Sequence, residues 1–146
     1  MPWLKLVGAV DAPMPDRWLD GRPDLADEVG FSSRAGVDIA DDLVMYAIPQ
    51  RRIIGIAEVL SHPIMNPKDG EERWPWRSVI RWKIAIADYD RCPGLADIEE
   101  PGGRILRKSV QRQSHIGLHW KEYVLARDAL NEAFDPSRGD RGQRVG

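Results

Sequence analysis

The chain has 146 residues, of which 42% are hydrophobic and 30% charged, with a formal net charge of −2 and one cysteine. This length suits one domain that buries about two-thirds of the surface of its unfolded chain, and a single cysteine excludes an internal disulfide. Because no apolar run approaches the roughly 20 residues of a membrane helix, we expect a soluble cytoplasmic protein with no membrane partner, cofactor or structural metal.

Charge is distributed unevenly along this sequence. Residues 11–28 carry six acids against two arginines, a balance that repels phosphate. Residues 73–91 carry five bases against two acids, and residues 104–121 carry five bases and no acid. Lys and Arg contacts to phosphate supply most non-specific affinity for nucleic acid. The two basic segments therefore either form one nucleic-acid-binding face or are ordinary solvated charge.

Residues 3–10 are apolar and partly alternating, which predicts a first strand buried in a small barrel. The pattern then fails. Residues 11–30 contain three prolines and scattered acids, so we expect a loop there, with at most a helical turn at 24–28.

Two strands are predicted next. Residues 43–48 form an apolar run that follows two aspartates and ends at Pro49, and residues 53–60 are rich in β-branched side chains, which favour extended backbone. Gly55 within the second run indicates a bulge or close packing. We expect the two strands to pair as a hairpin.

The middle of the chain alternates loops and one long strand. Residues 61–73 carry two prolines and an Asp-Gly pair and predict a projecting loop, and residues 76–87 predict a strand with one apolar and one basic face. Residues 88–103 are expected to be a connection with a helical turn at 95–99, and residues 104–110 fit a short strand or a short helix.

The clearest helix is residues 119–134, where apolar side chains, Trp120 among them, recur at helical spacing until Pro136. We expect one domain, residues 1–135, followed by a flexible tail, residues 136–146. Short strands, long loops and a terminal helix predict an α+β fold, a small mixed β-barrel flanked by helices.

Four stretches together resemble the EVE domain, a branch of the PUA-like superfamily that also includes the YTH and ASCH domains. Trp74-Pro75-Trp76-Arg77 is the most specific of them. The others are Asp41 to Tyr46, Arg52 to Val59, and Arg107 to Leu118. The resemblance spans residues 3–134 and implies a PUA-like barrel that captures a single base without performing chemistry on it, with modified cytosine or methylated adenine as the ligand of various members.

The resemblance implies a base pocket built from strand-opening aromatics and the loop between the first two strands. A base removed from a duplex needs aromatic faces and edge hydrogen bonds to replace those it lost. The expected pocket residues are Phe31, Ser32, Ser33, Trp74 and Trp76, with Trp18 as a lid. The expected contacts to the DNA or RNA backbone are Arg77, Arg81, Lys83, Arg107, Lys108 and Arg112.

Two alternatives stay open. An ASCH-like amidohydrolase acting on modified nucleosides would need a lysine, a hydroxyl and a carboxylate around a pocket; Lys83 or Lys108, Ser109 and Glu58 are nominees that no spacing selects. A protein-interaction or RNA-binding PUA-like module without a base pocket would use its tryptophans as core. His115 and His119, four residues apart, have no nearby third ligand and are expected to be structural.

Overall fold

The computed structural model describes residues 1–8, 13–20, 25–34, 36–68, 72–110 and 114–146. The described strands are β1 (Pro2–Val7), β2 (Ala26–Phe31), β3 (Asp42–Ala47), β4 (Arg52–Val59), β5 (Ile64–Met65), β6 (Trp76–Ala85), β7 (His115–Gly117) and β8 (Arg141–Gly142). The described helices are α1 (Leu106–Ser109) and α2 (Trp120–Ala133), with 3-10 turns η1 (Tyr89–Arg91), η2 (Leu95–Ile98) and η3 (Pro136–Arg138).

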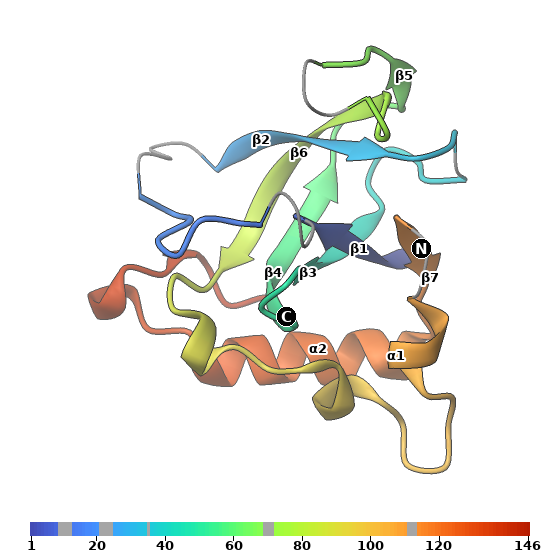
Figure 1. The fold of residues 1–146 in the computed structure, drawn as a ribbon. Coiled ribbons are helices and arrows are strands. Elements are labelled where there is room, and N and C mark those ends of the chain that lie inside the picture. Colours follow the sequence, from blue (N-terminus) through green and yellow to red (C-terminus); the bar gives the residue numbers. More distant parts are fainter. Residues whose placement is uncertain (9–12, 21–24, 35, 69–71, 111–113) are drawn as a thin grey trace.

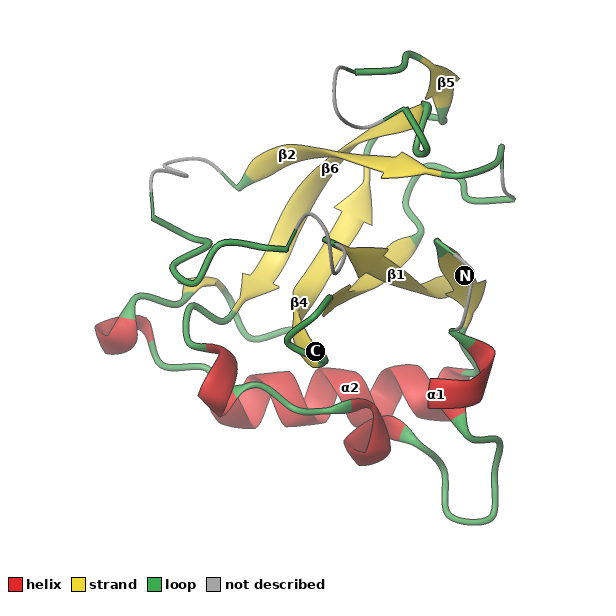
Figure 2. Ribbon diagram, in the orientation of Figure 1, coloured by secondary structure: helices red, strands yellow, loops and turns green. Residues whose placement is uncertain are grey.

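The described strands form one mixed sheet in the order β2-β6-β4-β3-β1-β7, with β5 and β8 also paired to β6. Only the β1–β3 pair among these ladders is parallel. β6 is long enough to pair first with β2 and then with β4, so it carries the sheet round a bend. The result is a curled half-barrel (Figure 1), and the helices lie along one side of it (Figure 2).

The hairpin predicted for residues 43–60 is confirmed by the antiparallel pairing of β3 with β4. The ladder between β3 and β4 shifts register at Gly55, which pairs with Met45. A Cβ at this glycine would lie 2.2 Å from the carbonyl oxygen of Ile84 and 2.9 Å from the Trp82 ring. Gly55 is therefore required by close packing, as its place in the strand indicated.

The prediction of a loop through residue 30 is wrong, because residues 26–31 form β2. Val29 and Phe31 are buried on one side of this strand, while Glu28 lies on the other side and remains partly exposed. β2 pairs with β6 along one edge only. An edge strand with a polar face shows little of the apolar signal by which strands are recognised in a sequence.

The flexible tail expected for residues 136–146 is corrected by the structure. β8 pairs with β6 at Ile84 and Ala85, and the Gln143 N–H donates to the Lys83 carbonyl at 2.9 Å. Asp140 is buried and accepts a hydrogen bond from Arg91 Nη1 at 2.9 Å. The segment is held mainly by polar contacts, so its sequence has few apolar residues that would indicate an ordered element.

The helix predicted for residues 119–134 is confirmed as α2, the turn near 95–99 is η2, and the ambiguous segment 104–110 contains the short helix α1. Trp120 was expected to belong to the buried stripe of α2 but is 64% exposed and stacks on Tyr123. Among the described residues, no helix is long and apolar enough to span a bilayer.

Candidate functional site

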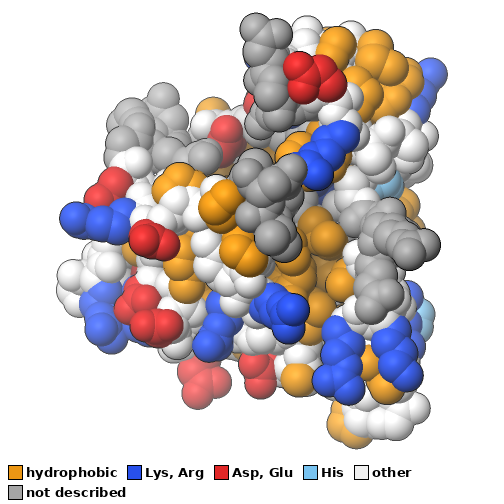
Figure 3. Space-filling model, in the orientation of Figure 1, with side chains coloured by type: hydrophobic (Ala, Val, Ile, Leu, Met, Phe, Trp, Pro, Cys, Tyr) orange, Lys and Arg blue, Asp and Glu red, His pale blue; other side chains and the backbone are white. Residues whose placement is uncertain are grey.

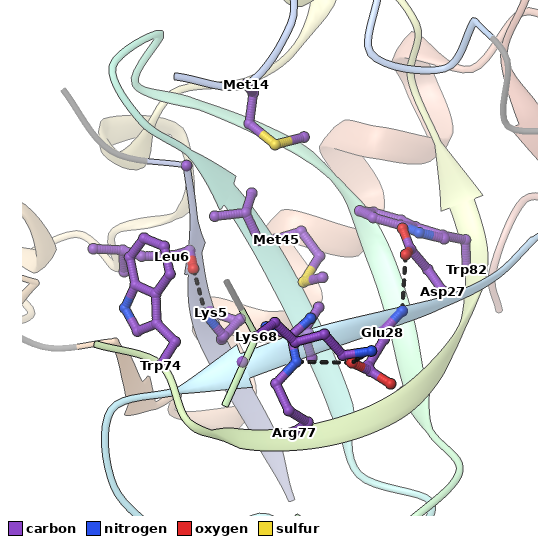
Figure 4. Close-up of a pocket in the computed structure, with 14 residues that line it drawn as sticks. Lys5, Leu6, Met14, Asp27, Glu28, Met45, Lys68, Trp74, Arg77 and Trp82 are labelled. Atoms are coloured by element: carbon purple, nitrogen blue, oxygen red, sulfur yellow. Dashed lines mark hydrogen bonds and ion pairs between the residues drawn. The ribbon is translucent and has the colours of Figure 1, made fainter. Parts of the chain in front are cut away.

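A cavity of about 370 Å³ lies between β1 and β2, which sit near opposite ends of the strand order. Strands β1, β2, β3 and β6 line it together with Met14, Lys68 and Trp74 from connecting segments. Figure 4 shows these side chains converging on one space, and Figure 3 shows hydrophobic side chains in the middle of the same face. The volume is that of a small-molecule site.

A polar contact links the two ends of the curled sheet beside this cavity. The Ser32 N–H and hydroxyl both approach the Ser114 hydroxyl, at 3.2 and 3.1 Å, and Ser114 Oγ lies 2.8 Å from His115 Nδ1. Phe31 packs edge-on against the His115 ring. Burial lowers the pKa of His115, and the positive charge of Lys5 lowers it further. These residues connect the end of β2 with the start of β7, the two edge strands of the sheet order. The cavity lies beside this connection.

Trp74 supplies an indole to the cavity wall. It is half-buried, and Pro75 after it has a fixed φ that restrains the backbone there. The Arg73 guanidinium lies 4.6 Å from the centre of the Trp74 ring and the Lys5 ammonium 6.0 Å from it. The aromatic platform is therefore positioned by neighbouring cations.

Lys5 places a positive charge in the cavity wall. Lys5 is only 3% exposed, and it lies among apolar residues in β1. Its ammonium donates to the Leu6 carbonyl and lies 5.3 Å from the centre of the Phe31 ring. A buried ammonium needs such acceptors and aromatic faces to offset its lost hydration. Lys5 is not among the pocket residues predicted from the sequence, although a cation inside an apolar strand is a signal that could have indicated it.

Another part of the cavity wall carries both positively and negatively charged side chains. Arg77 is buried, and its Nε donates to Glu28 Oε1 at 2.8 Å, while Lys68 Nζ lies 3.5 Å from the same oxygen. The hydrogen bond from Arg77 holds the pKa of the Glu28 carboxyl below its ordinary value. Asp27 Oδ1 accepts from the Glu28 N–H at 2.8 Å. The cavity thus presents carboxylate acceptors and cationic donors along with its apolar surface.

Replacement of Gly30 by alanine is expected to disturb the cavity. A Cβ at Gly30 would lie 2.7 Å from Arg77 Nη1, from Trp74 Cβ and from the Trp74 carbonyl oxygen. Overpacking of this kind costs about 1–3 kcal/mol, so thermal unfolding should occur at a lower temperature. At Gly36 a Cβ would meet nothing closer than 4.0 Å. If Gly30→Ala unfolds at the same temperature as Gly36→Ala, this packing is not tight.

Of the residues expected to form the pocket, Trp74 lines the cavity. Trp76 instead packs partly against the core, with Arg34 5.9 Å from its ring centre. Phe31 is fully buried beneath Lys5. Ser32 binds Ser114, and Ser33 is exposed.

Trp18 is a core residue and not a lid. It is 2% exposed, its indole N–H donates to the Ile86 carbonyl at 3.0 Å, and its ring lies 4.9 Å from that of Trp82. The proline-rich, acidic surroundings of Trp18 suggested a surface loop, but Trp18 folds back onto β6. Trp18 and Trp82 lie 64 residues apart in sequence, so no local sequence pattern predicts their contact.

The expected backbone contacts separate into two groups. Arg77 Nε donates to the Glu28 carboxylate, and Lys83 Nζ lies 2.7 Å from Asp42 Oδ1. Arg81, Arg107 and Lys108 are exposed. Figure 3 shows cationic side chains over α1 on the face that carries the cavity. Arg112 lies outside the described residues.

The nominees for catalysis are not assembled around the cavity. Lys83 Nζ lies 3.8 Å from Glu58 Oε2, but both line a different hollow, and Lys108 and Ser109 lie on α1. Within the part of the chain that the structure describes, no three His, Cys, Asp or Glu side chains are grouped as a metal site requires.

No protein-family model matches the sequence, and no curated protein sequence matches it significantly. Solved structures do match. A protein from Agrobacterium tumefaciens is 18% identical, with a TM-score of 0.59 over 88% of this chain and 92% of that one. A protein from Rhodopseudomonas palustris is 16% identical, with a TM-score of 0.59 over 92% and 96%.

A further match is the human THYN1 protein, solved in complex with DNA containing 5-methylcytosine. It is 12% identical to this chain, with a TM-score of 0.54 over 85% of this chain and 95% of that one. Together with the curled mixed sheet and its helices, these likenesses establish a PUA-like α+β fold, which confirms the predicted fold class.

Proposed function

We propose that this chain is a non-catalytic reader of nucleic acid that holds one extruded, modified base in the cavity between β1 and β2. The observation that carries the proposal is the Trp74 indole at the wall of a cavity of base-accommodating size in a PUA-like barrel. The complex of the similarly folded THYN1 with DNA containing 5-methylcytosine supports a modified cytosine as the ligand. Membership of the EVE branch is part of the same proposal.

The energetics of base capture suit this cavity. Extrusion of a base costs a few kcal/mol, and stacking on an aromatic side chain returns about 1–3 kcal/mol. Lys5 and Arg77 offer donors to a carbonyl or ring nitrogen, and Asp27 and Glu28 offer acceptors to an exocyclic amine. Contacts of both kinds are needed for a cytosine edge, which carries an amine beside acceptors.

Selectivity for a methylated base requires apolar surface next to those polar groups. Met14, Met45 and Trp82 provide it in the same cavity. A buried methyl group contributes roughly 0.8 kcal/mol, so we expect a preference of a few-fold over the unmodified base. A larger preference would require a better shape match than burial alone supplies.

Isothermal titration calorimetry with matched oligonucleotides tests the proposal. Duplexes and single strands carry 5-methylcytosine, 5-hydroxymethylcytosine or N6-methyladenine, with unmodified controls. We expect one modified oligonucleotide to bind more tightly than its control. Equal binding of all oligonucleotides would refute base selectivity and leave a general RNA- or DNA-binding module, and binding of none would refute the nucleic-acid partner.

The cations of α1 should contact phosphates beside the captured base. Each phosphate contact that is lost lowers the slope of log K against log salt by about one. The double variant Arg107→Ala and Lys108→Ala should therefore bind every oligonucleotide more weakly and with a shallower slope, measured by titration across salt concentrations. Arg138→Ala, in η3, removes an exposed charge away from α1 as a control. A loss confined to one base type would contradict the phosphate role.

A further inference from the structure

β5 projects from the sheet as a narrow apolar ribbon (Figure 1). Ile64 and Met65 are 61% and 56% exposed, although both are large hydrophobic residues. Successive residues of a strand face opposite sides, so exposure of both means that the two sides of this ribbon are open. Such a segment is a projection and not the uncovered face of a sheet.

The ribbon is held firmly at its base. Ile64 pairs with Arg77 and Met65 with Trp76 across the β5–β6 ladder. The Asn66 N–H donates to the Pro75 carbonyl at 2.8 Å. Pro63, just before the ribbon, is buried. The apolar pair is therefore presented by restrained backbone, which reduces the entropy lost on binding.

The projection and the cavity belong to one structural unit. Ile64 lies directly across the ladder from Arg77, which lines the cavity, and paired Cα atoms in such ladders are about 4.5–5.5 Å apart. The segment between β5 and β6 also contributes Lys68 and Trp74 to the cavity. A duplex that delivered a base to Trp74 would therefore pass close to β5.

We propose, on the basis of the function proposed above, that β5 inserts one of its two apolar side chains, Ile64 or Met65, into the base stack of the duplex at the place vacated by the extruded base. Ile and Met are among the apolar side chains that proteins insert between base steps. Residues 68–73, which follow β5 in the sequence, carry three acids and two bases, a balance that suits insertion between bases better than a phosphate contact. The insertion would keep the gap from closing while the base occupies the cavity.

Binding of one modified base in two settings tests this insertion. The base is presented within a duplex and within a single strand of the same sequence, to the wild-type chain and to the double variant Ile64→Ser and Met65→Ser. Only the duplex has a stack to fill. We expect the double variant to lose about tenfold in duplex affinity and to keep its single-strand affinity. Ile39→Ser, in the turn before β3 and 49% exposed, is the matched control and should change neither.

Each other outcome overturns the proposal in a recognisable way. Unchanged duplex affinity, or an equal loss with both ligands, shows that β5 does not act on the stack. If the wild-type chain binds only the single strand, insertion is excluded and the proposed base-reading function stands. If the wild-type chain binds neither ligand, both proposals are excluded. A double variant that changes only its oligomeric state, measured by light scattering, would assign the ribbon to contact between copies of the chain.

A fluorescent base gives an independent readout. With 2-aminopurine placed next to the modified base, unstacking by an inserted side chain raises fluorescence. The wild-type chain should produce this rise and the double variant should not, at concentrations that saturate both. The deficit should be the same at low and high salt, because insertion releases no counterions. A rise of equal size with the double variant would contradict insertion.

Discussion

Trp74→Ala is expected to lower the affinity for the preferred oligonucleotide by about tenfold or more. The indole lines the cavity, and its removal forfeits about 1–3 kcal/mol of base stacking, where 1.4 kcal/mol corresponds to a tenfold change. Trp74 is half-buried, so the fold should survive its truncation. Titration calorimetry measures the loss, and thermal unfolding checks that the protein remains folded at the temperature used.

Two variants sharpen this expectation. Trp74→Phe keeps an aromatic face and should retain most of the affinity. Trp76→Ala removes the other tryptophan beside Pro75, which packs against the core and does not line the cavity, so it should lower stability more than affinity. If Trp76→Ala weakens binding while Trp74→Ala does not, the cavity between β1 and β2 is not the binding site.

Asp140→Ala is expected to destabilise the fold by about 3–5 kcal/mol, the cost of breaking a buried ion pair. The Asp140 side chain has no exposed surface and is paired with Arg91. It also accepts from the N–H groups of Ala87 and Asp135, each at 2.8 Å. Denaturant unfolding measures the loss, which is a large share of the stability of an ordinary domain.

Asp128→Ala serves as the control, because that carboxylate is 63% exposed and its removal should change stability by about 0.5 kcal/mol or less. If Asp140→Ala is as mild as the control, the C-terminal segment is not fastened as the structure describes.

The Asp140 carboxylate also makes the stability of the fold depend on pH. Burial alone would raise the pKa of Asp140, but the hydrogen bonds from Arg91, Ala87 and Asp135 lower it below the ordinary value. Because this pKa is lower in the folded protein, the ionised carboxylate contributes its full stabilisation above the pKa of an aspartate in an unfolded chain, about 3.9. The stabilisation is lost as the pH falls through the pKa of Asp140 in the folded protein. Asp140→Asn should therefore flatten the acid side of the stability profile, and an unchanged acid limb would contradict this.

The elements that could be predicted from sequence are those whose signal is local. The strands near 43–48, 53–60 and 76–87 and the helix α2 are rich in apolar residues with strand or helix periodicity, and the structure contains all four. β2 and the C-terminal segment could not be predicted in the same way. β2 is an acidic edge strand, and residues 136–146 are held by Asp140, whose partner Arg91 lies 49 residues away.

The candidate site was predictable in part. The aromatic-Pro-Trp stretch drew attention to Trp74, but whether Trp74 or Trp76 faces the cavity depends on how the chain enters β6, which periodicity does not fix. Lys5 and Glu28 reach the cavity only because β1 and β2 meet across the curled sheet. That juxtaposition arises from tertiary structure, so a reading of neighbouring residues could not supply it.

A crystal structure of this chain bound to a short duplex with one 5-methylcytosine tests base capture most directly. We expect the modified base to lie out of the stack, in the cavity between β1 and β2, with its ring against Trp74 and its edge toward Lys5, Asp27 or Arg77. A structure in which the modified base stays paired in the duplex, or lies elsewhere on the protein while this cavity holds no base, would contradict it.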